Sequence, residues 1–558
     1  MIRFNNVTFA YNGSPKPALS QVSLTINRGE FVLVTGKSGS GKTSLCRTIN
    51  GLIPHFHGGT ISGTITVDGL NPVDASPSTM ATKVGMVFQD PENQLVTSDV
   101  SHEICFGMEN LGFPDNLIAE RLEESLRLLD LDHLRNRPIH ELSGGEKQRT
   151  IIASVLALRP DILILDEPTS ELDPEGACKT LSRLRELNYE LGLTVIIIEH
   201  RLDNIIQYAD RVIVMEKGQL VIDSSPESAM SEYGKEMISY GIGLPPIVQL
   251  FQKLANNGIT TGRVPLSVNE ASHVFAEVFN KPLSIAEDNN TISSNDLAVE
   301  LQGVSFVYPN GIKAIDNISL HIYRGEAVAI LGRNGSGKTT LVKLINGLLA
   351  PNLGALKILG RNIFKKTVAE LANSVGVVFQ NPADHLFTDS VEEEIAFGLK
   401  IRGFSPREIS KYIDTMLDQL NLGHCRGRNP LDLSSGEKQR LALASVLVYA
   451  PPVLVLDEPD RGTEEQTRQE LTRLLRDYCS AGNTVVIVTH DVEMAASFAQ
   501  RVIVMDEGKI TLDGNKHEVF PNAGLFSTQI NCLVKRFAHY GVSSKFLTAD
   551  EVAGAYCE

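Results

Sequence analysis

The chain has 558 residues, of which 42% are hydrophobic and 21% are charged, and its net charge is −16. This length is too great for one core and suggests several domains. The acidic balance disfavours a protein that coats nucleic acid, and no stretch approaches the roughly 18 consecutive apolar residues of a membrane-spanning helix.

The cysteines are scattered along the chain. All seven lie outside any CxxC pair, which is typical of reduced cytosolic thiols and offers no metal-ligand spacing. If the protein works at a membrane, we expect it to bind something already embedded there.

Short β-branched runs alternate with helical patterns from the start of the chain. "FVLVTG" at 31–36, "DILILDEP" at 161–168 and "TVIIIEH" at 194–200 predict buried strands, whereas "AERLEESLRLLDL" at 119–131 predicts an amphipathic helix. This alternation indicates an α/β domain with a largely parallel sheet.

A glycine-rich loop follows the first of these strands. "GKSGSGKT" at 36–43 fits the pattern G-x-x-x-x-G-K-[ST], and "GRNGSGKT" at 332–339 fits it again. Such a loop wraps its backbone N–H groups around phosphates at a helix N-terminus. We expect Lys42 and Lys338 to reach the β- and γ-phosphates, and Thr43 and Thr339 to bind Mg²⁺.

Polar residues close the predicted strands that follow each loop. Asp166 and Asp457 suit a carboxylate that holds Mg²⁺, and the adjacent Glu167 and Glu458 suit a group that orients or deprotonates the attacking water. Four further residues share this strand-end placement. An amide can touch both Mg²⁺ and the water, and a histidine can donate to the γ-phosphate; these residues are Gln89, Gln380, His200 and His490.

Two tyrosines precede the loops at matching distances. Tyr11 and Tyr308 lie 25 and 24 residues before the loop glycines and are placed to stack on adenine. An ordinary strand aromatic is the competing interpretation.

The second half of the chain repeats the first. "LSGGEKQR" at 142–149 recurs as "LSSGEKQR" at 433–440, and "VGMVFQDP" at 84–91 recurs as "VGVVFQNP" at 375–382, both 291 residues later. The C-terminal segments of the two halves also align, beginning at Gly243 and Gly524. Residues 280–297 are polar and aperiodic, which predicts a linker.

These motifs, in this order in both halves, resemble a tandem pair of ATP-binding-cassette ATPase domains. The resemblance implies two P-loop NTPase (RecA-like) α/β domains, each with an antiparallel β region and a helical signature subdomain. The predicted boundaries are 1–240 for the first cassette, 241–279 for its helical tail, 280–297 for the linker, 298–520 for the second cassette and 521–558 for its tail.

The family pattern also implies which residues hold ATP and Mg²⁺. The metal ligands would be Thr43, Gln89, Asp166, Thr339, Gln380 and Asp457. The catalytic residues would be Glu167, His200, Glu458 and His490. The other nucleotide-binding residues would be Tyr11, Gly36, Gly39, Ser40, Gly41, Lys42, Ser44, Ser143, Gly145, Tyr308, Gly332, Gly335, Ser336, Gly337, Lys338, Thr340, Ser434 and Gly436.

In the family, two cassettes pair head to tail, so that each ATP lies between one phosphate loop and the other cassette's signature. The resemblance therefore implies that Lys42, Glu167 and His200 work with Ser434, and that Lys338, Glu458 and His490 work with Ser143.

Three kinds of cassette protein compete. A Rad50- or SMC-type ATPase needs a long coiled coil inside a cassette, which the sequence lacks. An F-subfamily factor acting on the ribosome typically has a long charged linker, whereas this one is short and polar. The motor of a membrane transporter is therefore favoured, on the cytoplasmic face of the membrane and without nucleic acid as a partner.

Finer segments resemble the energy-coupling-factor importers and their cobalt and nickel relatives. They include "FQDPENQLVTSDVSHEICFGMENLG" at 88–112, "FQNPADHLFTDSVEEEIAFGLKIRG" at 379–403 and "EHRLDNIIQYADRVIVM" at 199–215. The resemblance implies a transmembrane coupling subunit, a small integral-membrane substrate-binding subunit, and uptake of a vitamin, vitamin precursor or metal ion. Four apolar residues here would be either local core or a groove for a partner helix: Leu95, Val96, Leu386 and Phe387.

The two halves differ at two places. Ser435 stands where the first signature has Gly144, and "PDRGTE" at 459–464 stands where the first half has "PTSELD" at 168–173. In the family arrangement, both differences would lie at the ATP site that contains Lys42. We therefore expect asymmetric hydrolysis, with the site of Lys338 the more competent.

Overall fold

The computed structural model describes residues 1–170, 172–259, 262–278, 282–285, 296–364, 366–461 and 463–557. The chain forms two compact units, one of residues 1–279 with 464–466 and the other of residues 280–463 with 467–558. They are called here the first and the second half. Among the described residues, no helix combines the length and apolar character needed to cross a bilayer.

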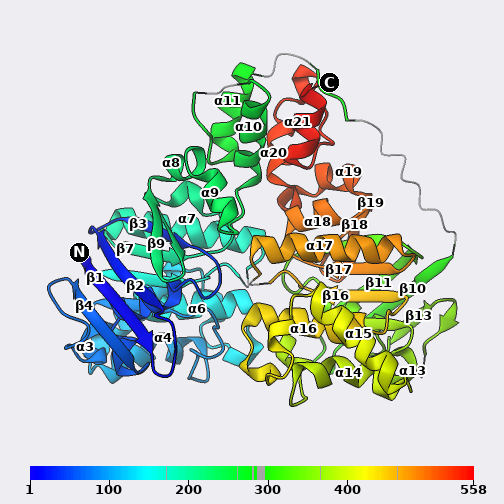
Figure 1. Cartoon of the computed structure of the whole chain (residues 1–558), viewed down its shortest axis with the longest axis horizontal. Coiled ribbons are helices and arrows are strands. Elements are labelled where there is room, and N and C mark those ends of the chain that lie inside the picture. The colour runs from blue at the N-terminus through cyan, green and yellow to red at the C-terminus, as the bar shows by residue number, and fades with distance from the viewer. Residues whose placement is uncertain are drawn as a thin grey trace. The chain divides into compact units, whose positions relative to one another are not determined.

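The first half contains a small antiparallel sheet and a larger, mostly parallel one (Figure 1). The small sheet has the order β2-β1-β4, with β1 at Ile2–Tyr11, β2 at Leu19–Ile26 and β4 at Gly59–Val67. The large sheet has the order β5-β6-β7-β3-β8-β9. Its strands are β3 (Phe31–Thr35), β5 (Val84–Val87), β6 (Ile162–Asp166), β7 (Thr194–Ile198), β8 (Arg211–Glu216) and β9 (Gln219–Ser224).

The central strands of the large sheet are buried along their whole length. Every residue of β3, β6 and β7 is buried, as expected for parallel strands covered on both faces. Only β9 runs antiparallel, against β8. The three strand predictions in this half are confirmed.

Helices surround these sheets. They are α1 (Lys42–Ile49), α2 (Leu52–His55), α3 (Pro77–Ala81), α4 (Val100–Asn110), α5 (Asp115–Leu128), α6 (Gly144–Leu156), α7 (Pro174–Leu191), α8 (Pro226–Ser231), α9 (Gly234–Ser239), α10 (Pro246–Asn256) and α11 (Val268–Val278). The predicted helix at 119–131 lies mostly within α5. In Figure 1, α10 and α11 lie beyond α8 and α9 as seen from the large sheet.

The second half repeats this architecture. The antiparallel sheet has the order β11-β10-β13-β14 and the large sheet the order β15-β16-β17-β12-β18-β19. The strands are β10 (Leu297–Val307), β11 (Lys313–Tyr323), β12 (Ala327–Gly332), β13 (Leu353–Ile358), β14 (Arg361–Asn362), β15 (Val375–Val378), β16 (Val453–Asp457), β17 (Thr484–Val488), β18 (Arg501–Asp506) and β19 (Lys509–Asn515).

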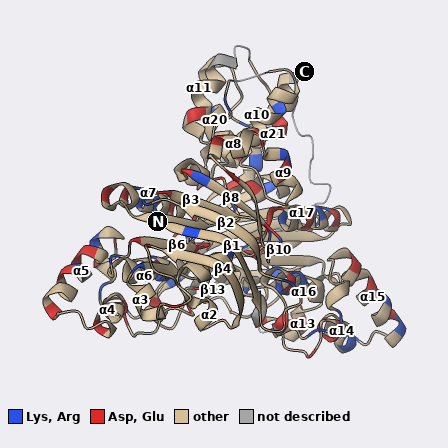
Figure 2. Cartoon of the chain, turned by 60° about the vertical axis from the view of Figure 1, so that its left-hand side comes forward, with Lys and Arg blue, Asp and Glu red and all other residues tan. Residues whose placement is uncertain are grey.

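The second half has its own set of helices, most of which have a counterpart in the first half. They are α12 (Lys338–Ile345), α13 (Val368–Leu371), α14 (Val391–Ile401), α15 (Pro406–Gln419), α16 (Ser435–Leu447), α17 (Glu465–Ser480), α18 (Val492–Phe498), α19 (Lys516–Val519), α20 (Gln529–Lys535) and α21 (Ala549–Cys557). In both halves, charged residues are frequent on the helices and sparse on the strands (Figure 2).

Most of the predicted linker at 280–297 lies outside the described residues. Within it, Leu283 is 3% exposed and pairs with Val542 as a short parallel bridge. Its backbone N–H donates to Gly541, and Ser543 donates to its carbonyl. This part of the segment therefore packs on the tail of the second half, a contact that its polar composition did not predict.

The predicted fold class is confirmed. Each half has a P-loop NTPase core, an antiparallel β region, and a helical region formed by α4, α5 and α6 or by α14, α15 and α16. The large sheet places the ends of its parallel strands beside the glycine-rich loop, where the polar residues of the motifs meet.

Candidate functional site

The glycine-rich loop of the first half joins β3 to α1. Gly41 has a φ of 104° and caps the helix in the left-handed region, and an added Cβ there would lie 2.4 Å from the Ala18 carbonyl oxygen. Only glycine fits this close backbone approach. The Lys42 ammonium folds back over the loop and donates to the carbonyls of Gly36 at 2.8 Å and Lys37 at 2.9 Å.

The second loop, between β12 and α12, has the same geometry. Gly337 has a φ of 98°, and Lys338 donates to Gly332 at 2.7 Å and Arg333 at 2.8 Å. The Ser40 and Ser336 hydroxyl oxygens are both buried and have no hydrogen-bond partner among the described residues. Buried polar atoms of this kind usually await a ligand or water.

The strand-end carboxylates lie beside these loops. Thr43 donates to Asp166 at 2.9 Å across 123 residues of sequence, which brings the loop and the end of β6 together. Glu167 and Glu458 follow β6 and β16 with φ angles of 51° and 50°. A glutamate in the left-handed region is strained, and the same strain at both strand ends is typical of a functional position.

Each glutamate contacts the histidine at the end of the neighbouring strand. His200 Nε2 lies 3.2 Å from a Glu167 carboxylate oxygen, and His490 Nε2 lies 2.5 Å from one of Glu458. Gln380 donates to the second Glu458 oxygen at 2.6 Å. In the first half, a hydrogen bond from Gln89 to Glu167 lowers the pKa of that carboxylate. The structure thus brings the predicted glutamine, glutamate and histidine together in each half.

Hydrogen bonds and nearby charges give the two neighbouring carboxylates different proton affinities, although both are buried. Desolvation, reinforced by the adjacent glutamate, raises the pKa of Asp166 and of Asp457 to about 6. Desolvation acts on Glu167 and Glu458 as well, but hydrogen bonds from the histidines and the charge of the loop lysine outweigh it and lower their pKa. The glutamates are therefore ionised at neutral pH, as an acceptor of a water proton must be.

The aspartates fit a divalent cation. Both Asp457 carboxylate oxygens are buried and have no hydrogen bond of regular geometry from the described residues, although the Thr339 hydroxyl lies near enough to favour the charged form. A buried carboxylate with so few donors is costly unless a cation or proton compensates it. With Thr339 and Gln380, Asp457 offers the oxygen ligands that Mg²⁺ prefers, and Thr43, Asp166 and Gln89 repeat the set. Bound there, Mg²⁺ would neutralise phosphate charge.

The two tyrosines lie beside the loop helices. The Tyr11 hydroxyl is 2.9 Å from the Ser44 hydroxyl, and the Tyr308 hydroxyl is 3.1 Å from that of Thr340. Each ring packs edge-on against a phenylalanine of the same strand region. Adenine stacking by these rings stays a prediction.

The signature serines cap α6 and α16 with the same geometry. Glu146 accepts from the Ser143 N–H at 2.7 Å and hydroxyl at 2.8 Å; the Glu437 carboxylate accepts from Ser434 at 2.8 and 2.7 Å. This is a reciprocal capping box in both halves. Ser435 therefore leaves the start of the signature helix unchanged.

The loop after the strand-end glutamate does differ between the halves. Leu172 is buried against Gly145, where an added Cβ would lie 3.0 Å from its Cδ2 atom. The second half has the smaller Thr463 there. Among the described residues, only the Arg440 side chain, at 3.8 Å, lies within 4 Å of a Cβ added at Gly436.

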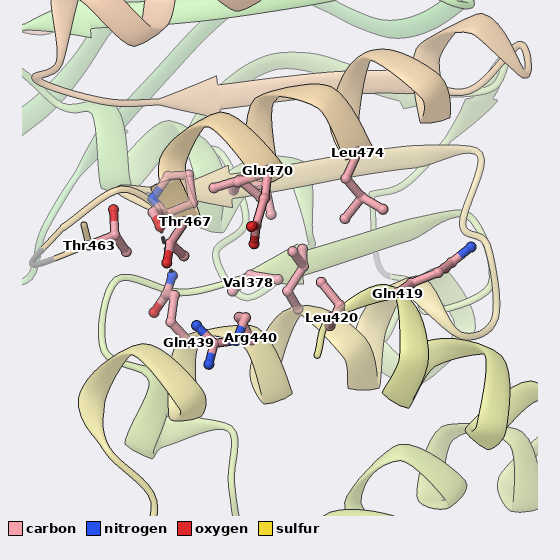
Figure 3. Close-up of a pocket in the computed structure, with 13 residues that line it drawn as sticks. Val378, Gln419, Leu420, Gln439, Arg440, Thr463, Thr467, Glu470 and Leu474 are labelled. Carbon is pink, nitrogen blue, oxygen red and sulfur yellow. Dashed lines mark hydrogen bonds between the residues drawn. The ribbon is translucent and has the colours of Figure 1, made fainter. Parts of the chain in front are cut away.

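This difference coincides with a cavity of about 40 Å³ in the second half. Figure 3 shows Thr467, Glu470 and Leu474 of α17 on one side, Gln439 and Arg440 of α16 opposite, and Thr463 at one end. At the position of Leu474, 291 residues earlier, the first half has Arg183, which donates to the Leu128 carbonyl. The cavity therefore lies where Thr463 is smaller than Leu172 and where Leu474 is shorter than Arg183.

Sequence reasoning missed two buried glutamates. Glu103 in α4 is 4% exposed and accepts from the backbone of Val96 and Thr97; Glu394 in α14 is 2% exposed and accepts from Phe387 and Thr388. Each carboxylate fixes the loop after the strand-end glutamine. Their matching positions in the repeat were the available signal.

The apolar residues of these loops divide between core and surface. Leu386 is buried and Leu95 packs against the core of the first half. Val96 and Phe387 are instead 63% and 64% exposed. The first residue of each pair is therefore local core, and the second is available for a partner.

Comparison with known proteins identifies a family for this chain. A family model described as ABC transporter matches residues 19–170 and 315–461. The chain is 37% identical over 531 residues to a protein of Methanosarcina mazei named as an ABC transporter ATP-binding protein, covering 93% of this chain and 90% of that one. A relative of the same description from Caldanaerobacter subterraneus is 38% identical over 525 residues, covering 92% and 91%.

Solved structures are similar over part of the chain. That of cbiO1 from Clostridium perfringens, part of the ABC transporter complex cbiONQ, is 35% identical, with a TM-score of 0.39, and the match covers 44% of this chain and 98% of that one.

The fold and the paired sites define a P-loop ATPase with two ATP-binding cassettes. The chain belongs to the ABC transporter family. It is the ATPase motor of such a transporter, with ATP as its substrate and Mg²⁺ as its metal ion.

Proposed function

We propose that this chain drives an importer of the energy-coupling-factor type, on the cytoplasmic face of the membrane, for a vitamin, vitamin precursor or metal ion. The observation that carries the proposal is the pair of exposed apolar sites beside the strand-end glutamines. Their surrounding segments, 88–112 and 379–403, are those that resemble the importer group.

Each site joins the loop to the helix that follows it. Phe387 and Phe397 in α14 stack edge-to-face with ring centres 4.7 Å apart, and both are exposed. In the first half, Val96 and Phe106 in α4 occupy the same repeat positions and are also exposed. Exposed aromatic pairs of this kind are common at protein interfaces.

The link to ATP runs through the same loops. Gln380 contacts Glu458 and lies seven residues before Phe387, whose backbone N–H is held by buried Glu394 at 3.0 Å. A partner helix docked on Phe387 would therefore sense movement at the reaction site. The proposed roles are phosphate binding by the loop lysines, proton acceptance by Glu167 and Glu458, and γ-phosphate contacts by His200 and His490.

The test is affinity purification from detergent-solubilised membranes of cells that express the tagged chain with its genomic neighbours. We expect a transmembrane subunit and a small integral-membrane subunit to co-purify. The combined Val96→Ser and Phe387→Ser variant should lose both, whereas Tyr189→Ser, at a 72% exposed tyrosine of α7, should keep them. Sedimentation with ribosomes, or no membrane partner, would refute the proposal.

A further inference from the structure

Three metal-ligating side chains meet beside the signature helix of the second half. His424 and Cys425 lie in the turn after α15, and Glu437 lies in the first turn of α16. His424 Nε2 is 2.9 Å from Glu437 Oε1, and the Cys425 thiol donates to the same oxygen at 3.3 Å. The three donor atoms all lie within 4.8 Å of one another.

These distances suit a small tetrahedral ion. Zinc bonds of about 2.0 to 2.3 Å place neighbouring ligand atoms roughly 3.3 to 3.8 Å apart. The two shorter contacts lie at or just below that range, so a slight spreading of the side chains would admit the ion. Imidazole, thiolate and carboxylate are its usual ligands, and water would complete the coordination.

The first half lacks this set. The equivalent positions, 291 residues earlier, hold His133, Leu134 and Glu146, so that a buried leucine replaces the thiol. In the described part of the chain, no other group of three such residues gathers its ligand atoms this closely. The repeat therefore provides its own control, with the same backbone and one ligand missing.

The two carboxylate oxygens of Glu437 have separate neighbours in this cluster. Oε1 lies 2.9 Å from His424 Nε2 and accepts from the Cys425 thiol, whereas Oε2 accepts from the Ser434 hydroxyl. One oxygen of Glu437 therefore faces both of the other candidate ligands. Coordination of a divalent metal deprotonates a thiol outright, and the proton leaves to solvent.

Two arginines near the cluster disfavour the binding of a cation only in part. Arg426 is paired with Glu392 and Asp414. The guanidinium of Arg428 lies 3.9 Å from Cys425 Sγ and also donates to the Asp432 carbonyl. Its charge disfavours a free cation but stabilises the thiolate that the metal requires. The His424 side chain is exposed and Cys425 is buried, so the cluster has one ligand open to solvent.

We propose that His424, Cys425 and Glu437 form a site for Zn²⁺ or a similar divalent transition metal, present in the second half alone. Glu437 would serve two purposes through its two oxygens. Oε1 faces His424 and Cys425, while Oε2 accepts from Ser434 in the capping box. The bound ion would therefore brace the signature of the second half. Metal binding itself does not depend on the proposed transport function.

The test uses the purified full chain, freed of metal by a chelator and titrated with Co²⁺ as a spectroscopic probe. We expect one Co²⁺ per chain, with a thiolate-to-cobalt charge-transfer band that Zn²⁺ abolishes by competition. Cys425→Leu, the residue of the first half, should lose this band. His424→Ala should weaken binding at least tenfold, because even an outer partner of a metal site contributes about 10- to 100-fold.

The controls are His133→Ala and Cys178→Ser, which should bind as the parent chain does. Thermal unfolding establishes that each variant is folded, and His424→Ala, at an exposed side chain, carries the test if Cys425→Leu unfolds. The proposal is overturned if no thiolate band forms, if the band survives Cys425→Leu, or if His424→Ala binds Co²⁺ as tightly as the parent chain.

Discussion

Thr169 and Glu199 form a partly buried hydrogen bond in the first half, and the second half makes a similar bond with the hydroxyl and the carboxylate in exchanged positions. The Thr169 hydroxyl donates to Glu199 at 2.6 Å. At the equivalent positions, the Thr489 hydroxyl donates to Asp460 at 2.8 Å. Each bond ties the segment after the strand-end glutamate to the residue before the histidine.

Glu199 predicts a pH-dependent contribution to the stability of the first half. Desolvation raises its pKa from 4.5 to about 7, so the folded state binds the proton more tightly than the unfolded state. The free energy of unfolding should therefore fall as pH rises between these values, by on the order of 3 kcal/mol. Glu199→Gln should raise the melting temperature at pH 8 and leave it nearly unchanged at pH 4.

Scanning calorimetry at both pH values measures this effect. Glu232→Gln, at an exposed glutamate in the same half, serves as the control and should melt as the parent chain does. Equal gains from Glu199→Gln at both pH values would contradict the assignment.

Tyr11 offers a test of adenine stacking. In a chain whose second loop is disabled by Lys338→Ala, Tyr11→Phe should bind ATP within about twofold of its parent, and Tyr11→Ala roughly tenfold more weakly, because the ring supplies the contact. Calorimetric titration distinguishes these results. Equal losses in both variants would instead assign the effect to the hydroxyl bond with Ser44.

Filling the cavity of the second half should stabilise it. Thr463→Leu restores the residue type of Leu172, and cavity-filling changes typically add about 0.5 to 2 kcal/mol to the free energy of unfolding. Its mirror, Leu172→Thr, should destabilise the first half by a comparable or larger amount. Chemical denaturation of both variants provides the measurement, and a loss of stability in Thr463→Leu would show that the space is needed.

Most of what could be predicted from the sequence came from its internal repeat. Loops, strand-end carboxylates and signature serines recur at fixed offsets, and their roles follow from local chemistry. Glu103 and Glu394 escaped because an acid in a first helical turn is ordinary, and only burial distinguishes them. Cys425 and Glu437 lie twelve residues apart, a spacing that resembles no metal motif until the turn and helix meet. The cavity depends on two separate side chains that no short motif contains.

The family resemblance implies that the ATP bound by Lys42 contacts the segment 459–464 of the second half, which departs from the family pattern. The ATP bound by Lys338 would contact the segment 168–173 of the first half, which follows that pattern. Glu458→Gln should therefore lower ATP turnover more than Glu167→Gln. Steady-state phosphate release from the two variants makes the comparison. An equal or larger loss in Glu167→Gln would reverse the predicted asymmetry.

The most direct test of the account is ATP turnover by the chain carrying Glu167→Gln and Glu458→Gln together, with nucleotide binding measured on the same sample. Both glutamates are ionised, strained in φ and paired with histidine. The account predicts that the double variant binds ATP with affinity near that of the parent and hydrolyses it at least a hundredfold more slowly, within the range of general-base catalysis. Turnover within a few fold of the parent chain would contradict the assignment of these two residues as the catalytic bases.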